Sequence, residues 1–182
     1  MTTSVTGMTE VRWHARAGQG AKTAAQVLAL ALMREGQSVQ AFPEYGPERR
    51  GAPLKAFTRT SGRPIRRHDT VTTPDLVVVL EPTLVRESDV ADGLREGGLV
   101  LLNAEEAPPE LDGIEVRCVP ATRLAAEQGS GFVNIVMLGA VAAVLGRPSV
   151  ESLAEAAADQ LARKVAPDAV RAAVREGFAW LS

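Results

Sequence analysis

Cysteine is almost absent from this sequence: Cys118 is the only one in 182 residues. A single thiol can form no internal disulfide and cannot hold an iron–sulfur cluster alone, and this composition fits a reducing cytoplasm. Residues 1–10 lack the apolar core of a secretory signal, and no apolar run approaches the ~18 residues of a membrane span. The sequence therefore predicts a cytoplasmic protein with no membrane partner.

Aromatic residues are also scarce, and the net charge is small. Phe, Trp and Tyr make up 4% of the chain and the formal net charge is −2, so the sequence offers neither stacking platforms nor a field that attracts nucleic acid. Apolar residues make up 46%, which is enough for a sizeable core. We expect one domain over residues 1–182, with residues 1–9 flexible.

The first regular element is an alternation of apolar and polar residues at 11–16, which predicts a half-buried strand. Residues 21–35 form a predicted helix that is apolar nearly all round and ends at Gly36, and a short strand follows at 38–42. Such a strand–helix–strand unit predicts parallel strands.

Later segments extend this pattern into an α/β chain. Apolar, β-branched runs predict further strands at 54–60, 76–80, 99–102 and 116–119. Helices are expected at 83–88, 134–145, 150–164 and 168–180, with Ser149 and Asp168 as N-caps. The predicted fold is a three-layer, Rossmann-like domain with a mainly parallel sheet and a helical C-terminal third.

The turn Gly18-Gln19-Gly20 stands where the first strand meets the first helix. Glycines at this place let a backbone approach an anion, which the free N–H groups of the helix would bind. The dinucleotide fingerprint is incomplete, because Thr23 replaces the third glycine and the acidic candidate Glu44 comes late. Close strand–helix packing, a phosphate-bearing ligand and a docked partner loop all remain open.

The segment at 43–53, PEYGPERRGAP, follows the second strand and is expected to be a loop. It could be solvated surface, but the carboxyl edge of an open α/β sheet is where ligands collect. Arginine could fork onto a phosphate or carboxylate there, and tyrosine offers a stacking face. The candidate residues of this loop are Tyr45, Gly46, Glu48, Arg49 and Arg50.

No residue set in the sequence predicts catalysis by this chain alone. His14 and His68 are the only histidines, and neither is paired with a nucleophile or with carboxylates at metal-ligand spacing. Cys118 ends an apolar strand and reads as a small core residue.

These two loops, in this order, resemble the gamma subunit of the pyruvate and 2-ketoacid:ferredoxin oxidoreductases. The resemblance rests on the Gly18–Gly20 turn with Thr23-Ala24-Ala25, on the loop from Tyr45 to Pro53, and on Asn134 with Met137-Leu138-Gly139-Ala140. It covers residues 11–146 and, more loosely, the helical tail. Ala17 departs from the family's usual glycine, and an asparagine often present near the start of the final helix is missing.

The resemblance implies an enzyme that decarboxylates a 2-oxoacid oxidatively to acyl-CoA, with this chain as a subunit that is not catalytic alone. Thiamine diphosphate, magnesium and iron–sulfur clusters are then expected on partner subunits, and coenzyme A is the one cofactor that could contact this chain. The implied partners are alpha and beta subunits, with delta as a further candidate and ferredoxin as an indirect partner. The implied site residues are Gly18, Gln19, Gly20, Thr23, Tyr45, Gly46, Glu48, Arg49, Arg50 and Asn134.

Two alternatives remain. The chain could be an independent dinucleotide-binding oxidoreductase, or a non-catalytic interaction module that docks through its charged loop. An indolepyruvate-type member of the resembled family, or one serving another oxoacid, fits nearly as well.

Overall fold

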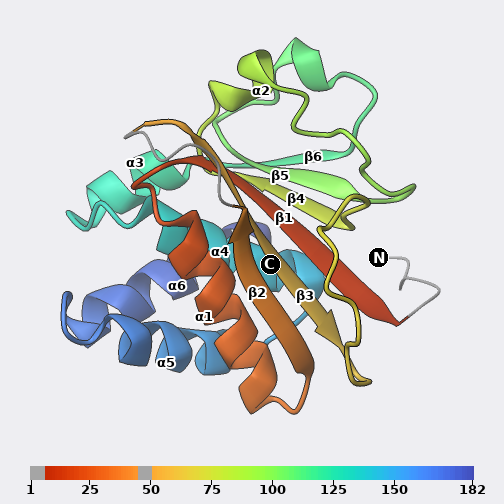
Figure 1. Ribbon diagram of the computed structural model, residues 1–182. Coiled ribbons are helices and arrows are strands. Elements are labelled where there is room, and N and C mark those ends of the chain that lie inside the picture. The colour runs from red at the N-terminus through yellow and green to blue at the C-terminus, as the bar shows by residue number, and fades with distance from the viewer. Residues whose placement is uncertain (1–6, 45–50) are drawn as a thin grey trace.

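The computed structural model describes residues 7–44 and 51–182 (Figure 1). The strands are β1 (Met8–Arg16), β2 (Ser38–Glu44), β3 (Pro53–Ser61), β4 (Leu76–Val79), β5 (Leu99–Asn103) and β6 (Val116–Val119). The helices are α1 (Ala21–Arg34), α2 (Leu84–Glu87), α3 (Ala121–Glu127), α4 (Val133–Leu145), α5 (Val150–Leu161) and α6 (Pro167–Leu181), with a 3₁₀ helix η1 (Pro109–Leu111).

The strands form one sheet in the order β2-β3-β1-β4-β5-β6. β4, β5 and β6 continue from β1 in parallel, whereas β3 pairs antiparallel with both β1 and β2. The prediction of a mainly parallel sheet is confirmed, but β1 and β2 are not neighbours. The connection from Glu44 to Pro53 is shorter than the dozen or so residues of a parallel crossover, so β3 runs back along β2 and separates it from β1.

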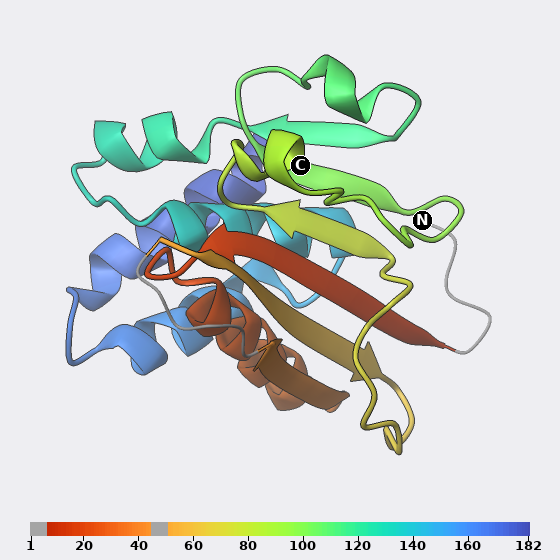
Figure 2. The same cartoon turned by 45° about the horizontal axis from the view of Figure 1, so that its top comes forward.

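Helices cover the two faces of the sheet unequally (Figures 1 and 2). On one face, Val11 and Trp13 of β1 pack in a large core with residues of α1, α4, α5 and α6. On the other face, Val77 and Val79 of β4 belong to a smaller core with residues of α2 and η1. The three-layer, Rossmann-like prediction is therefore confirmed, with one thick helical layer and one thin layer.

The most deeply buried helix is α4 rather than α1. α1 exposes Lys22, Gln26 and Arg34 along one side, so the prediction that it is apolar nearly all round is wrong. α4 is buried along almost its whole length from Ile135 to Val144. It lies between the sheet and α6, which explains why no polar face is needed.

Several predicted boundaries shift. β1 begins at Met8, and Met8 and Thr9 of the supposedly flexible start pair with β3. β1 is also buried on both faces rather than half-buried, because its polar side chains have partners: Glu10 accepts from Arg59 of β3, and Arg12 donates to the Val90 carbonyl. Helix α3 was not predicted.

The predicted helix caps have different outcomes. Ser149 caps α5 by accepting a hydrogen bond from the Ser152 N–H, as expected. Asp168 is not an N-cap: Ala166 is, with Pro167 in the first helical position. Asp168 instead accepts a hydrogen bond from Arg171 at 3.0 Å. Within the described part of the chain, no helix has the length and apolar character needed to cross a bilayer.

Candidate functional site

A cavity of about 650 Å³ opens at the carboxyl ends of β1, β4 and β5. α1 leaves β1 on one face of the sheet and α2 follows β4 on the other, so the cavity lies at a topological switch point. Open α/β sheets bind ligands at such crevices. The lining residues are Gly18, Gln19, Gly20, Thr23, Leu80, Glu81, Pro82, Asn103, Thr122, Gly131, Phe132, Val133, Asn134, Ile135, Leu161, Lys164 and Val165.

The glycine turn forms one wall of this cavity. Gly18 and Gly20 have φ angles of 96° and 83°, a left-handed conformation that favours glycine. Gln19 folds back over the turn, and its Oε1 accepts a hydrogen bond of 2.7 Å from the Arg16 N–H. Across the cavity, Asn134 Nδ2 donates to the Gly20 carbonyl at 3.3 Å, which ties the start of α4 to the start of α1.

Glu81 lies two residues after the end of β4. Hydrogen-bond donors on both sides hold its carboxylate in place. Gln19 Nε2 donates to one carboxylate oxygen at 2.7 Å, and Thr83 Oγ1 donates to the other at 2.9 Å. Burial alone would raise the pKa of Glu81, but these hydrogen bonds outweigh it and hold the pKa below its usual value. The cavity therefore carries a fixed carboxylate at this wall.

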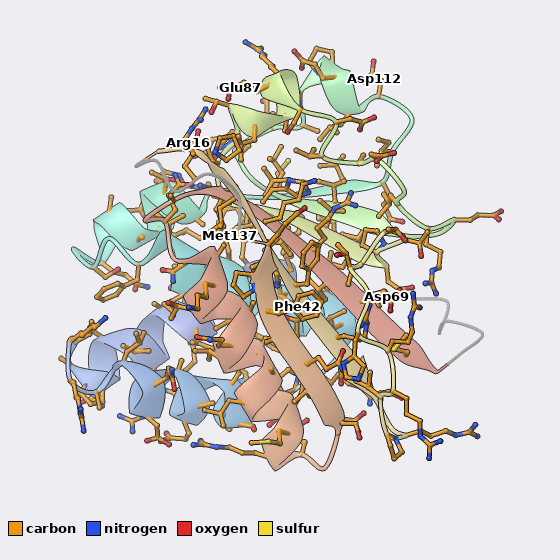
Figure 3. The ribbon with its side chains drawn as sticks, in the orientation of Figure 1. Arg16, Phe42, Asp69, Glu87, Asp112 and Met137 are labelled. Atoms are coloured by element: carbon orange, nitrogen blue, oxygen red, sulfur yellow. The ribbon has the colours of Figure 1, made fainter. Side chains whose placement is uncertain are left out.

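Arg16, at the end of β1, joins this wall to neighbouring segments. Its guanidinium donates to Thr83 Oγ1 at 2.8 Å and pairs with Glu87 of α2, and Figure 3 shows Arg16 and Glu87 at the same end of the sheet. It also donates to the Gly51 carbonyl at 3.3 Å, and the Ala17 N–H donates to the Ala52 carbonyl at 2.9 Å. The chain after residue 50 thus returns beside the glycine turn.

Asn103 closes the floor of the cavity at the end of β5. It is buried, with 5% of its surface exposed, and its Nδ2 donates to the Leu80 carbonyl and to Thr122 Oγ1, both at 2.9 Å. Its Oδ1 accepts the Thr122 N–H at 3.1 Å. This fully paired amide fixes the ends of β4 and β5 to the start of α3, and it provides rigidity rather than a free donor.

One helix N-terminus and one lysine supply positive character. No side chain in residues 7–44 or 51–182 caps α1, so the first-turn N–H groups of α1 are available to an anion. At α4 the Val133 and Ile135 N–H groups already donate to the Gly131 and Phe132 carbonyls, at 3.1 Å and 2.9 Å. Lys164 lines the opposite rim, and Phe132, Ile135 and Val165 add apolar wall. A ligand with phosphate groups and an apolar or aromatic part fits this combination.

The predicted site residues divide into two groups. Gly18, Gln19, Gly20, Thr23 and Asn134 all line the cavity. The predicted loop residues Tyr45, Gly46, Glu48, Arg49 and Arg50 lie outside the described residues.

Sequence reasoning missed Glu81, Thr122 and Lys164 as lining residues. A signal for Glu81 was present, because it is a polar residue at the carboxyl end of a buried strand. Lys164 had no such signal, since only the tertiary packing of α5 brings it to the cavity.

Glu44 does not take the position that dinucleotide binding requires. The acidic residue of that fold stands at the end of the strand next to β1. Here Glu44 pairs with Lys55 of β3, and Lys55 pairs in turn with His14 of β1, so a whole strand separates Glu44 from the glycine turn's strand. The topology therefore counts against the dinucleotide alternative.

The histidines and the cysteine lie outside the cavity lining. His14 is buried, His68 is exposed, and Cys118 is half-buried in β6, where desolvation raises the pKa of its thiol. Among residues 7–44 and 51–182, no three or more His, Cys, Asp or Glu side chains gather as a metal site.

Comparison with known proteins gives a consistent result. Residues 10–180 match the family model described as pyruvate ferredoxin/flavodoxin oxidoreductase. The chain is 44% identical over 178 residues to the pyruvate/ketoisovalerate oxidoreductases common subunit gamma of Thermococcus litoralis, covering 94% of this chain and 96% of that one. It is 49% identical over 147 residues to pyruvate synthase subunit PorC of Methanothermobacter marburgensis, covering 80% and 82%.

Solved structures agree. Pyruvate oxidoreductase subunit PORC from Thermotoga maritima superposes with a TM-score of 0.79 at 35% identity, over 95% of this chain and 96% of that one. The fold also matches 31% of a 2-oxoglutarate:ferredoxin oxidoreductase chain from Magnetococcus marinus, over 96% of this chain, with a TM-score of 0.82 at 20% identity. The chain therefore belongs to the pyruvate ferredoxin/flavodoxin oxidoreductase family, in which it is a gamma-type subunit.

Proposed function

We propose that this chain, as a single domain in the cytoplasm, serves a thiamine-diphosphate-dependent 2-oxoacid:ferredoxin oxidoreductase and receives the nucleotide part of coenzyme A in its cavity. The relatives are named as subunits of pyruvate or ketoisovalerate oxidoreductases, which supports a 2-oxoacid as the substrate of the complex. Thiamine diphosphate, magnesium and iron–sulfur clusters belong in this proposal to alpha and beta subunits, with delta as a further candidate. A single cysteine fits that division.

The observation that carries the coenzyme A part is the shape and chemistry of the cavity. The free first-turn N–H groups of α1 and the Lys164 ammonium suit phosphates, and the Phe132 side chain suits a purine. The Magnetococcus marinus structure, which shares the fold, was solved with coenzyme A and succinyl-CoA bound. The fixed carboxylate of Glu81 would repel phosphates, so we place them on the Asn134 and Lys164 side of the cavity.

Within this proposal the chain binds and orients; it does not carry out the redox step. The oxidative decarboxylation is supplied by thiamine diphosphate on a partner subunit. Asn134 keeps the two helix N-termini together through its bond to Gly20, and the Gln19–Glu81 contact keeps the turn rigid. A preformed cavity avoids the free-energy cost of ordering the protein's own loops and side chains on binding.

The assembly part is tested by reconstitution. The isolated chain should show no 2-oxoacid-dependent reduction of ferredoxin or of a dye, and adding it to thiamine-binding and iron–sulfur subunits of the same host should restore acyl-CoA formation. Activity of the isolated chain, or full activity of the other subunits without it, would reject the assignment.

Arg49 and Arg50 are candidates for an additional phosphate contact, since Gly51 and Ala52 lie beside the glycine turn. Replacing both by Ala distinguishes two roles. A raised KM for coenzyme A in an intact complex indicates ligand contact, and failed assembly indicates docking. An unchanged holoenzyme would exclude both roles for this loop.

A further inference from the structure

The segment between β3 and β4 carries a concentration of positive charge that the cavity does not use. Residues 62–69 read GRPIRRHD, and Arg63, Arg66, Arg67 and His68 are all exposed. Asp69 is the only acidic residue among them. We call Arg63 and Arg66 with the residues between them the basic tip.

The basic tip lies at the end of the sheet opposite the cavity. β3 runs antiparallel to β1, so the residues after Ser61 emerge where β1 and β4 begin. Figure 1 shows this segment descending past the end of β3, and Figure 3 places Asp69 far from Arg16 and Glu87. A partner could therefore cover the basic tip without closing the cavity.

A buried ion pair holds the segment in place. Arg59 of β3 is fully buried, and its Nε donates to Glu10 Oε1 at 2.7 Å. The same guanidinium donates to the Asp69 carbonyl at 3.1 Å and to Gln40 Oε1 at 3.0 Å, while Gln40 Nε2 donates to the Arg67 carbonyl at 2.8 Å. Burying an ion pair costs free energy, so a pair that fixes the Asp69 carbonyl directly, and the Arg67 carbonyl through Gln40, indicates that the loop's position matters.

The charges of the segment are not equally available. Asp69 forms an ion pair with Arg67, whose hydrogen bond lowers the pKa of Asp69 to about 2. Arg67 is therefore locally neutralised. Arg63 and Arg66 form no ion pair with any side chain in residues 7–44 and 51–182. Two exposed guanidinium groups thus remain on a segment whose backbone is fixed.

We propose that the basic tip docks onto a carboxylate-rich surface of a companion subunit in the oxidoreductase complex. The inference rests on the proposed function. Arginine is enriched at protein interfaces, where its planar fork binds carboxylates through two hydrogen bonds. The chain as a whole carries a net charge of −2, which disfavours a polyanion and favours a local, protein-sized contact.

The test measures association of the full-length chain with the purified thiamine-binding subunits by surface-based kinetics at several salt concentrations. The variant Arg63→Glu/Arg66→Glu should lower the association rate constant on the order of tenfold at low salt, because opposite charges steer encounter. Its deficit should shrink as salt rises. The control Arg147→Glu/Arg175→Glu makes the same charge change on exposed residues of the helical layer and should stay within about twofold.

The possible outcomes are distinguishable. Failure of the unmodified chain to associate rejects the proposed function itself. Association that is equally fast for both double variants rejects only the docking inference, provided that circular dichroism shows both variants folded. Tighter binding of the unmodified chain to anionic vesicles, to duplex DNA or to a second copy of itself than to the subunits also overturns it.

Discussion

At the scale of single residues, His14 is the most perturbed of the groups that titrate near neutral pH. It is buried on the thinly covered face of the sheet, and its Nε2 accepts a hydrogen bond of 3.0 Å from Arg12 Nε. Desolvation, followed by the positive charges of Arg12 and Lys55, lowers its pKa to about 3. The imidazole is therefore neutral in the folded protein at physiological pH.

This shift predicts acid sensitivity. An unfolded histidine takes up a proton near pH 6.5, whereas folded His14 does so only near pH 3, so the unfolded state binds more protons between these values. The free energy of unfolding should fall as pH decreases through this window, with His14 contributing up to about 1.4 kcal/mol per pH unit. Urea denaturation at a series of pH values measures the slope.

The variant His14→Gln keeps an acceptor for Arg12 but cannot titrate. It should show a shallower slope between about pH 6.5 and pH 4 than the unmodified chain. His68→Gln, which removes the exposed histidine, is the matched control and should keep the steep slope. Identical slopes for His14→Gln and the unmodified chain would disprove a buried neutral imidazole.

The two glycines of the turn give a second prediction, because they separate the cost of a left-handed backbone from the cost of displacing Asn134. Gly18 and Gly20 both have positive φ, but a Cβ on Gly18 would meet nothing within 4 Å, whereas a Cβ on Gly20 would lie 2.5 Å from Asn134 Nδ2. Gly18→Ala should thus cost only the left-handed backbone penalty of about 1–2 kcal/mol.

Gly20→Ala should cost about 1 kcal/mol more than Gly18→Ala, since Asn134 must move. Adding Asn134→Ala to Gly20→Ala should remove that difference. Thermal and urea unfolding of the variants measure these values, and equal costs for the two glycine substitutions would mean that the Gly20–Asn134 contact is not tight.

At the scale of elements, the packing of α4 against α6 depends on two glycines. A Cβ on Gly139 would overlap the Val174 carbonyl oxygen, and a Cβ on Gly177 would overlap the Val136 carbonyl oxygen. The helices therefore cross with their backbones in direct contact. Because α4 also packs near the cavity through Asn134 and Ile135, this crossing sets the position of one cavity wall.

Gly177→Ala should destabilise the chain by about 3 kcal/mol, because the obstacle is backbone and cannot rotate away. Ala172→Ser, an exposed substitution on the same helix, should change stability by no more than about 0.5 kcal/mol. Urea denaturation followed by circular dichroism measures both. A loss of less than 1 kcal/mol for Gly177→Ala would show that the helices can separate easily.

Most elements were predictable because their periodicity is strong. The LVVV run of β4 and the apolar 134–145 segment could hardly be anything but buried. The place of β3 was not predictable in the same way, because propensity says nothing of strand order. A short connection implies antiparallel pairing, and that argument was available, but the insertion of β3 beside β1 depends on tertiary packing.

At the scale of the whole molecule, the cavity wall formed by the glycine turn could be predicted from the sequence better than the walls formed by Asn134 and Lys164. Gly18, Gln19 and Gly20 were found because a glycine turn between a strand and a helix has a known physical use. Asn134 was found through resemblance alone, and its contact with Gly20 joins residues that are 114 positions apart in the chain. Lys164 had no local signal, since it lies in the turn after α5, and only the packing of α5 brings that turn to the rim.

Kinetics of the assembled enzyme would show whether this cavity receives the phosphate-bearing part of coenzyme A. Lys164→Ala removes a charge from the cavity rim, and Arg163→Ala removes one from the adjacent exposed position that does not line it. We predict that Lys164→Ala raises the KM for coenzyme A about tenfold, as loss of a charge-assisted contact should, and leaves the KM for the 2-oxoacid unchanged. Arg163→Ala should alter neither. Equal coenzyme A KM values for the two variants in a fully assembled complex would show that the cofactor's phosphates do not bind in this cavity.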